Sequence, residues 1–261
     1  MAAKVNVKAK KPPAKSEAGS AAIYLYGLTR IGRPLPPGTK GVDAISSVEA
    51  IPCGDFFCWI SRVNRAEYSD QLQQNMDNLE WLASASVAHH RVVGEIAKLS
   101  DILPARFGTV FLNEKSLIED VQRRKKQLAA AFDRISGTEE WGVKVFAVES
   151  SQSPAVTAQS GKDYLLKKSA ALEARRERKP DPELEPFAEA LRAIALDQVR
   201  GGKFSGAQRD LQFQASYLIP RKQRDKFHAV LKKYAGKWAD SHRIEYAGPW
   251  PPYSFVSTDG Q

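Results

Sequence analysis

Two adjacent histidines, His89 and His90, are the first residues of this chain that suggest chemistry. Adjacent helical residues point roughly 100° apart, so the pair cannot hold one metal ion as two histidines four positions apart could. His89 falls on the apolar side of an expected helix, which favours a core histidine with one hydrogen bond to a backbone group or a carboxylate. The alternative is a metal-dependent enzyme that combines His89 with carboxylates elsewhere in the chain. Bound metal that is lost in His89→Ala without unfolding would support that alternative.

Sequence motifs for catalysis or nucleotide binding are absent. The chain has no H-E-x-x-H, no G-x-S-x-G and no Walker pattern. Its two cysteines, Cys53 and Cys58, are too few for a disulfide framework or a zinc site, and we expect both to be buried. The sequence therefore predicts no catalytic residue, no metal site and no cofactor, and we expect a protein that is not an enzyme.

The net charge of +9 is concentrated at the N-terminus. Residues 1–20 hold five lysines and one glutamate and carry +4, which leaves +5 on the other 241 residues. This composition predicts a disordered basic tail. Binding of nucleic acid through the tail is an alternative function, which deletion of residues 1–20 should abolish. The other basic runs alternate with acidic residues or lie opposite an apolar helix face, so nucleic acid stays the minor alternative.

Composition indicates a soluble chain of two domains. The 261 residues are 43% hydrophobic and 26% charged, as in ordinary globular proteins. No apolar stretch reaches the roughly 18 residues that a membrane span needs. The N-terminus lacks the apolar core of a secretory signal. We therefore expect a cytoplasmic protein without a membrane partner.

Hydrophobic periodicity predicts α+β structure. Strands are expected at 21–28, 44–51, 56–63, 106–111 and 141–148, with helices at 64–74, 76–99 and 116–135. The second and third strands flank Gly54-Asp55 and should form a hairpin. On the helix at 76–99 we expect one buried stripe, which contains Leu79, Leu82, Ser86, His89, Val93 and Ile96. This element order fits a ferredoxin-like α+β sandwich that ends near residue 149.

The second half is expected to form a smaller α+β domain with a long helical arm. Residues 150–160 are rich in Ser, Gln, Ala and Thr and predict a linker. The arm is expected at 162–179, followed by a helix at 183–199, a strand at 211–219, a helix at 221–240 and a strand at 244–247. The predicted organisation is a tail at 1–20, a first domain at 21–149, the linker and a second domain at 161–261.

The C-terminal segment combines prolines with aromatic residues around Trp250. Prolines fix the backbone, while Trp250, Tyr253 and Phe255 offer large apolar faces. We expect this segment to lock against a domain, with Trp250→Ala costing on the order of 3 kcal/mol. A near-neutral effect on stability would instead make Trp250 an interface anchor. A second candidate is Arg106, expected in a strand beside Phe107, where it would serve an internal ion pair or a docking surface.

The string G-P-W-P-P-Y-S-F at residues 248–255 resembles the C-terminal signature of the GvpF/GvpL family, accessory proteins of gas vesicle formation. Six further segments are similar to family landmarks in the same order. They are Ile23–Gly27, Trp81-Leu82 with Ala88-His89 and Val92, Leu103–Phe111, Glu140–Val145, Gly161-x-x-Tyr164-Leu165 and Ser216–Leu218. The similarity extends from about residue 21 to residue 256 and omits the basic tail.

This resemblance implies an assembly factor. Proteins of this family are associated with the small hydrophobic shell subunit of the gas vesicle and with other accessory proteins, and are minor vesicle components. By resemblance, the chain would bind the gas vesicle structural shell protein and limit its aggregation during vesicle nucleation and growth. Its expected location is the cytoplasm, at the gas vesicle. A soluble protein that covers apolar subunit surface can suppress aggregation by mass action.

Overall fold

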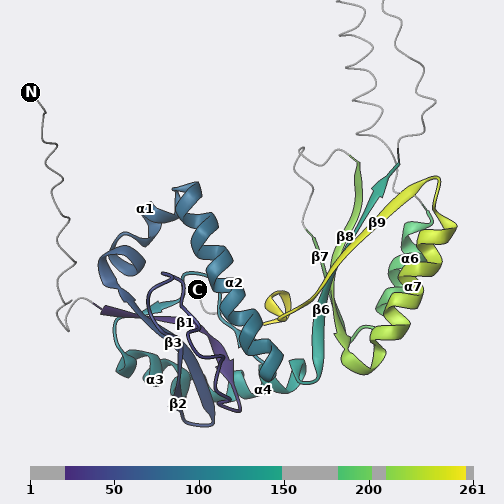
Figure 1. Ribbon diagram of the computed structural model, residues 1–261. Helices are drawn as coiled ribbons and strands as arrows, with labels where there is room; N and C mark the ends of the chain where they lie inside the picture. Colours follow the sequence, from purple (N-terminus) through teal and green to yellow (C-terminus); the bar gives the residue numbers. More distant parts are fainter. Residues whose placement is uncertain (1–20, 149–181, 202–209, 257–261) are drawn as a thin grey trace, which may run out of the picture. The chain divides into compact units, whose positions relative to one another are not determined.

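The computed structural model describes residues 21–148, 182–201 and 210–256 (Figure 1). These residues form α+β structure with two antiparallel sheets, which confirms the expected fold class. Contacts divide the chain into two units, Met1–Ile96 with Ala105–Lys125, and Ala97–Pro104 with Lys126–Gln261. The expected tail, linker and helical arm lie outside the described residues.

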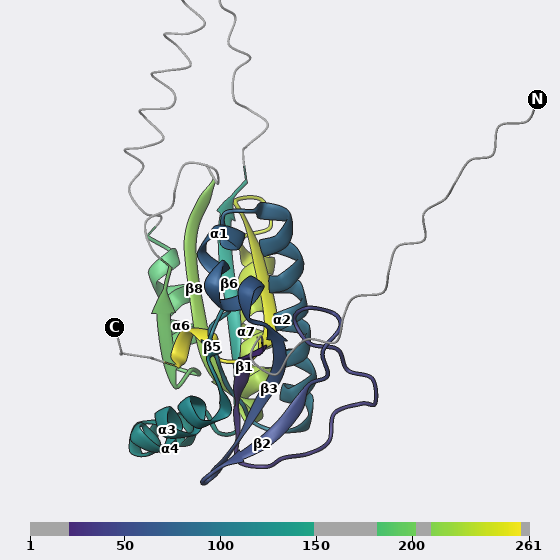
Figure 2. The same ribbon diagram turned by 90° about the vertical axis from the view of Figure 1, so that its left-hand side faces the viewer.

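The first unit is organised around β1, which is buried along almost its whole length. Its strands are β1 (Ala21–Thr29), β2 (Glu49–Cys53), β3 (Phe56–Asn64) and the short β5 (Val110–Phe111), and the two-residue β4 (Leu103–Pro104) precedes β5. Strand β1 pairs with β3 on one side, and it also pairs with β5. Strands β2 and β3 form the expected hairpin, seen with its connection to β1 in Figure 2.

Helices of the first unit follow β3. They are the π-helical turn η1 (Ala66–Asp70), α1 (Leu72–Met76), α2 (Leu79–Leu99) and α3 (Glu114–Arg123). Asn78 caps α2, because its side-chain oxygen accepts from the backbone N–H groups of Glu80 and Trp81. Asn113 and Ser116 form a reciprocal cap at the start of α3.

Several expected elements differ in their bounds, and two of these differences have a clear local cause. The strand expected at 44–51 begins only at Glu49, because Ala44 has a φ of 58° and the Asp43 carboxylate binds the N–H groups of Ile45 and Ser46 in a turn. The helix expected at 116–135 is divided into α3 and α4 (Lys125–Ile135). The backbone leaves helical geometry at Arg124, whose guanidinium bonds Asp120 one turn earlier.

The second unit is built on a sheet with the order β7-β8-β6-β9. Its elements after α4 are β6 (Thr138–Ala147), α6 (Leu184–Arg192), β7 (Asp197–Arg200), β8 (Leu211–Pro220), η2 (Arg221–Gln223), α7 (Arg224–Lys237), β9 (His242–Trp250) and η3 (Tyr253–Phe255). Helices α6 and α7 cover one face of this sheet (Figure 1). The ferredoxin-like order β-α-β-β-α-β, which was expected at 21–149, appears here among the described elements instead, with the antiparallel neighbours β6 and β8 in the middle of the sheet.

Strand β6 corrects the expected domain division. The sequence placed a strand at 141–148 at the end of the first domain, whereas β6 pairs with β8 and β9 in the second sheet. Its inward residues Trp141, Val143 and Val145 pack in one core with Phe213 and Phe227. The boundary between the two units in the sequence therefore does not lie at residue 149, because β6 pairs with strands that come much later in the chain.

Candidate functional site

The C-terminal segment is anchored through Phe255 and not through Trp250. Phe255 in η3 is 2% exposed, whereas Trp250 at the end of β9 is 54% exposed. The expectation that Trp250 fills a core site is therefore wrong. Trp250 pairs opposite Glu140 after a register shift in the β6–β9 ladder, at the end of an edge strand where its indole reaches solvent. Tyr253 lies between the two in exposure, and burial raises the pKa of its hydroxyl.

A carboxylate on β6 holds the same segment. Glu140 is 7% exposed, and it accepts hydrogen bonds from the backbone N–H and the hydroxyl of Ser254 at 2.9 and 2.6 Å. Sequence reasoning missed this pair, because the two residues lie 114 positions apart. The C-terminal signature is thus a structural element whose outer part, including Trp250, stays accessible to a partner.

Arg106 lies in the loop between β4 and β5, where a strand was expected. Its carbonyl oxygen accepts from the N–H and hydroxyl of Thr109, and Gly108 takes a φ of 79° in this turn. The guanidinium is exposed, and within the described residues it makes no ion pair. An internal ion pair of Arg106 is therefore excluded within the described residues. A role of Arg106 in a docking surface stays a prediction.

Phe107 next to it belongs to an aromatic cluster around His89. Its ring lies 6.4 Å from Tyr24, 6.2 Å from Trp81 and 5.8 Å from His89 between centroids. The Arg106–Phe107 pair thus combines an exposed cation with a half-buried ring, and only the latter supports the fold directly.

His89 is fully buried and takes a structural role. Its Nδ1 lies 2.9 Å from the Tyr24 hydroxyl, and the ring also bonds the backbone of Ala105. The bond to Ala105 favours the protonated ring, so the backbone group must be the carbonyl, which accepts a ring N–H. The other ring nitrogen therefore carries the proton, and Nδ1 accepts from the Tyr24 hydroxyl. Burial, reinforced by neighbouring His90, lowers the pKa of His89 to about 4. A neutral histidine enclosed in this way has no open coordination position, and within the described ranges no group of three or more His, Cys, Asp or Glu side chains could hold a metal ion.

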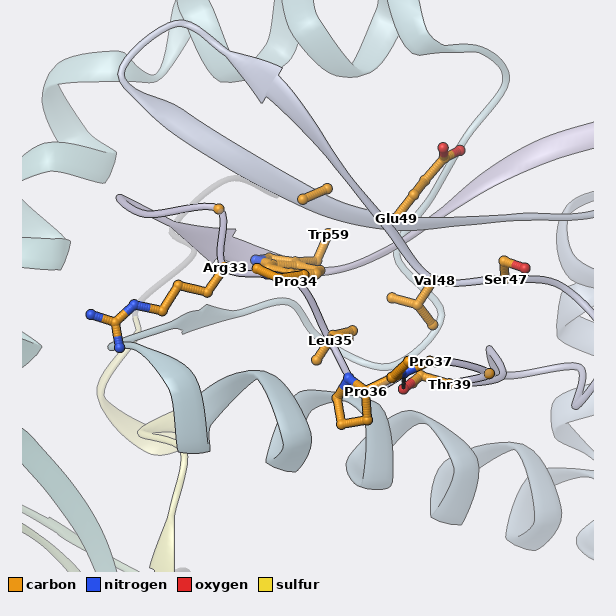
Figure 3. Close-up of a pocket in the computed structure, with 13 residues that line it drawn as sticks. Arg33, Pro34, Leu35, Pro36, Pro37, Thr39, Ser47, Val48, Glu49 and Trp59 are labelled. Carbon is orange, nitrogen blue, oxygen red and sulfur yellow. Dashed lines mark hydrogen bonds between the residues drawn. The ribbon is translucent and has the colours of Figure 1, made fainter.

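A shallow pocket of about 390 Å³ lies between the loop after β1 and the start of the β2–β3 hairpin (Figure 3). Its lining residues are Gly32–Thr39, Ser47–Ala50 and Trp59. The charged side chains of Arg33 and Glu49 point away from the apolar lining (Figure 3). The indole N–H of Trp59 donates to Thr29 Oγ1 at 2.9 Å, so it is not available as a donor to a ligand in the pocket. These walls offer apolar contact and no acid–base pair.

The most distinctive surface lies on α2. The exposed fraction is 80% for Leu79 and 70% for Val87. Ala83 is also exposed between them at four-residue spacing, so the three side chains form one stripe along the helix. We call these residues, Leu79, Ala83 and Val87, the α2 stripe. Leu79 was expected on the buried stripe, and that expectation is wrong because Leu79 lies in the first turn of α2, ahead of Trp81, which packs against Phe107, and of Ala85, the first buried residue.

Charge is missing from this part of α2. Residues 81–90 contain no acidic or basic side chain other than the two histidines. An exposed helix normally carries charged residues on its solvent face. The sequence signal that could have revealed this surface is thus the run of ten residues without Asp, Glu, Lys or Arg.

Comparisons with known proteins agree with this architecture. The family model described as "Gas vesicle synthesis protein GvpL/GvpF" matches residues 22–257. The chain belongs to the GvpL/GvpF family. It is 28% identical to gas vesicle protein L of Streptomyces sp. (strain CB03234), over 89% of this chain and 92% of that protein.

Two crystal structures share the fold. GvpF from Anabaena sp. PCC7120 superposes with a TM-score of 0.66 at 20% identity, over 92% of this chain and 98% of that one. GvpF from Microcystis aeruginosa gives 0.63 at 20% identity, with 90% and 99% covered. Membership of this family connects the chain with gas vesicle formation. None of the helices in the described residues is both long and apolar enough to cross a membrane.

Proposed function

We propose that this chain acts in gas vesicle assembly by binding the small hydrophobic shell subunit and other accessory proteins. By holding the subunit in a soluble complex, it limits aggregation during vesicle nucleation and growth. It would work in the cytoplasm at the growing vesicle and remain as a minor vesicle component. The observation that carries this proposal is the α2 stripe, together with membership of the GvpL/GvpF family.

The stripe fits an apolar partner for energetic reasons. Exposed leucine and valine side chains gain about 1.5–3 kcal/mol each when an interface buries them completely. Charged residues at such positions would oppose docking, since an unpaired charge is costly to bury. The exposed positions Glu80 and Ser84 flank the stripe on one side, and Arg91 follows Val87 at its C-terminal end, so polar residues border the apolar contact there.

A pull-down after co-expression tests the proposal. The tagged chain is expressed with the hydrophobic shell subunit of the same genome, and the soluble complex is measured against insoluble subunit. Val87→Asp should reduce co-elution strongly because it places a charge in the contact. Ser84→Asp is the matched control, as it adds the same charge to an exposed position of the same helix outside the stripe, and should co-elute as the wild type does.

Removal of residues 1–20 separates the competing functions. The soluble complex should survive this deletion if the folded units carry the interface. Equal co-elution of Val87→Asp and wild type would argue against the stripe. A shell subunit that stays insoluble with and without the wild-type chain would contradict the function itself.

A further inference from the structure

Helix α7 and the preceding turn η2 carry a group of lysines that pair with no carboxylate in the described part of the chain. The fold uses the other cations of this segment, since Arg221 pairs with Asp101 at 2.6 Å, Arg224 with Glu139 at 2.5 Å and Lys237 with Glu183 at 2.8 Å. Among the described residues, the remaining cations of the segment form no ion pair; they are Lys222, Lys226, Lys232 and Lys233. Lys233 also lies 6.0 Å from the centroid of the Tyr234 ring, a contact within its own helix, and no ion pair among the described residues uses the charge of these lysines to hold the unit together.

The positions of these lysines define one face of α7. Phe227 and Leu231 point into the core, which turns the opposite side of the helix to solvent. Lys226 and Lys233 are seven residues apart, close to two helical turns, and therefore share one flank. Lys232 lies on the other flank of the exposed side.

Small residues separate the two flanks. Ala229 and Gly236 are exposed and again seven residues apart, so they follow the middle of the exposed side. A Cβ atom added to Gly236 would meet nothing within 4 Å, so the fold itself does not require glycine there. Glycine in a helix costs about 1 kcal/mol relative to alanine. A partner that approaches the helix backbone closely would account for this glycine.

We propose that this face of α7 is a docking surface for an acidic helical segment of another protein. A second helix can lie close to Ala229 and Gly236 while its carboxylates meet Lys226 and Lys232 on either side. Charge complementarity of this kind raises the association rate and sets the register of the partner. The surface is separate from the α2 stripe, so the two proposals can fail independently.

The acidic groups around the lysines favour a peptide over a nucleic acid. Asp225 is exposed on α7 itself, and Glu189 is exposed on α6, which packs beside α7. A phosphate backbone presents regularly spaced negative charge and would be repelled by both carboxylates. A helix can instead place its carboxylates opposite the lysines and leave neutral side chains opposite Asp225 and Glu189.

Binding of a defined probe to the full chain tests the proposal. The probe is a fluorescein-labelled helical peptide of about 20 residues of glutamate and alanine, a length that supports helix formation in water. Fluorescence anisotropy is measured at about 50 mM salt, where screening is weak. The Lys226→Glu/Lys233→Glu variant should weaken binding by about ten-fold or more.

Two further variants separate a docking surface from general attraction. Lys115→Glu/Lys126→Glu makes the same change in net charge on exposed positions of α3 and α4, and should bind the peptide nearly as tightly as wild type. Gly236→Leu leaves the charge unchanged but fills the strip between the flanks, and should also weaken binding. Circular dichroism confirms that each variant is folded.

Several results would overturn the proposal. Wild-type chain that does not bind the acidic peptide excludes the surface, as does equal weakening by the two double variants. Equal binding of a lysine–alanine peptide would show that charge plays no part. Tighter binding of a DNA duplex of about 20 base pairs, with the same loss in Lys226→Glu/Lys233→Glu, would assign the face to nucleic acid instead.

Discussion

The Glu140 carboxylate binds Ser254 twice, through the backbone N–H at 2.9 Å and through the hydroxyl at 2.6 Å. This contact fixes the C-terminal segment on β6, directly before Phe255 enters the core. Trp250, only four residues earlier than Ser254, stays 54% exposed. One short segment therefore divides into an anchoring part and a part that is open to solvent.

Phe255→Ala should destabilise the second unit by about 3 kcal/mol, because it empties a buried aromatic site. Trp250→Ala should cost about 1 kcal/mol or less, since much of its indole is already in water. Chemical denaturation of both variants, followed by circular dichroism, measures the difference. A Trp250→Ala loss as large as that of Phe255→Ala would contradict the assignment of Phe255 as the anchor.

The fold class could be predicted from the sequence because local patterns determine most elements. The strand at β1, the β2–β3 hairpin at Gly54-Asp55 and helix α2 all follow from periodicity and turn residues. The assignment of β6 to a sheet could not be predicted in this way. Its partners β8 and β9 lie far along the chain, and hydrophobic alternation predicts a strand but not the strand with which it pairs.

The exposed surfaces were the least predictable part of the candidate site. Leu79 has the spacing of a buried residue, yet it is in the first turn of α2, ahead of the first buried residue, Ala85. Trp250 has the large apolar side chain of a typical core residue, yet it lies at the end of the edge strand β9, beyond a register shift, and is exposed. In both cases an apolar side chain lies at the end of an element, where burial depends on neighbours that sequence spacing does not reveal.

Gly248→Ala should be strongly destabilising. Gly248 has a φ of 150°, and an added Cβ would come within 2.8 Å of the Glu140 carbonyl oxygen and of the Trp141 ring. Backbone cannot move aside as a flexible side chain can, so we expect a loss on the order of 2 kcal/mol or more. Thermal unfolding measures it.

Gly94→Ala is the control for that prediction. It lies within α2, and its added Cβ would meet nothing within 4 Å, so alanine should stabilise the helix by up to about 1 kcal/mol. Similar melting temperatures for Gly248→Ala and Gly94→Ala would show that the close approach at Gly248 can relax.

Arg106→Ala should leave the free energy of unfolding within about 0.5 kcal/mol of wild type, because the exposed guanidinium has no ion pair in the described residues. Phe107→Ala should cost about 2 kcal/mol or more, since its ring contacts Tyr24, Trp81 and His89. If Arg106 belongs to a docking surface, Arg106→Ala should weaken a partner complex at unchanged stability. Urea titrations and the pull-down on the same samples separate these effects, and a destabilised Arg106→Ala would reveal a structural role.

His89 should make the first unit sensitive to acid. Burial lowers the pKa of His89 from 6.5 to about 4, so between these values the unfolded chain binds a proton that the folded chain does not. Stability from this residue is complete above about pH 6.5, falls as the pH decreases towards 4 and is constant below. The full difference corresponds to about 3 kcal/mol.

His89→Gln tests this origin of the pH dependence. A glutamine amide can accept from the Tyr24 hydroxyl and donate to the Ala105 carbonyl, but it does not titrate. The variant should be less stable than wild type at pH 7, because its shape fits the aromatic cluster less well, yet its stability should fall less steeply between pH 6.5 and 4.5. Carboxylates titrate in both proteins, so their contribution cancels when urea unfolding curves are compared at each pH. Identical slopes in the two proteins would show that His89 is already protonated in the folded state or that its site opens to water before global unfolding.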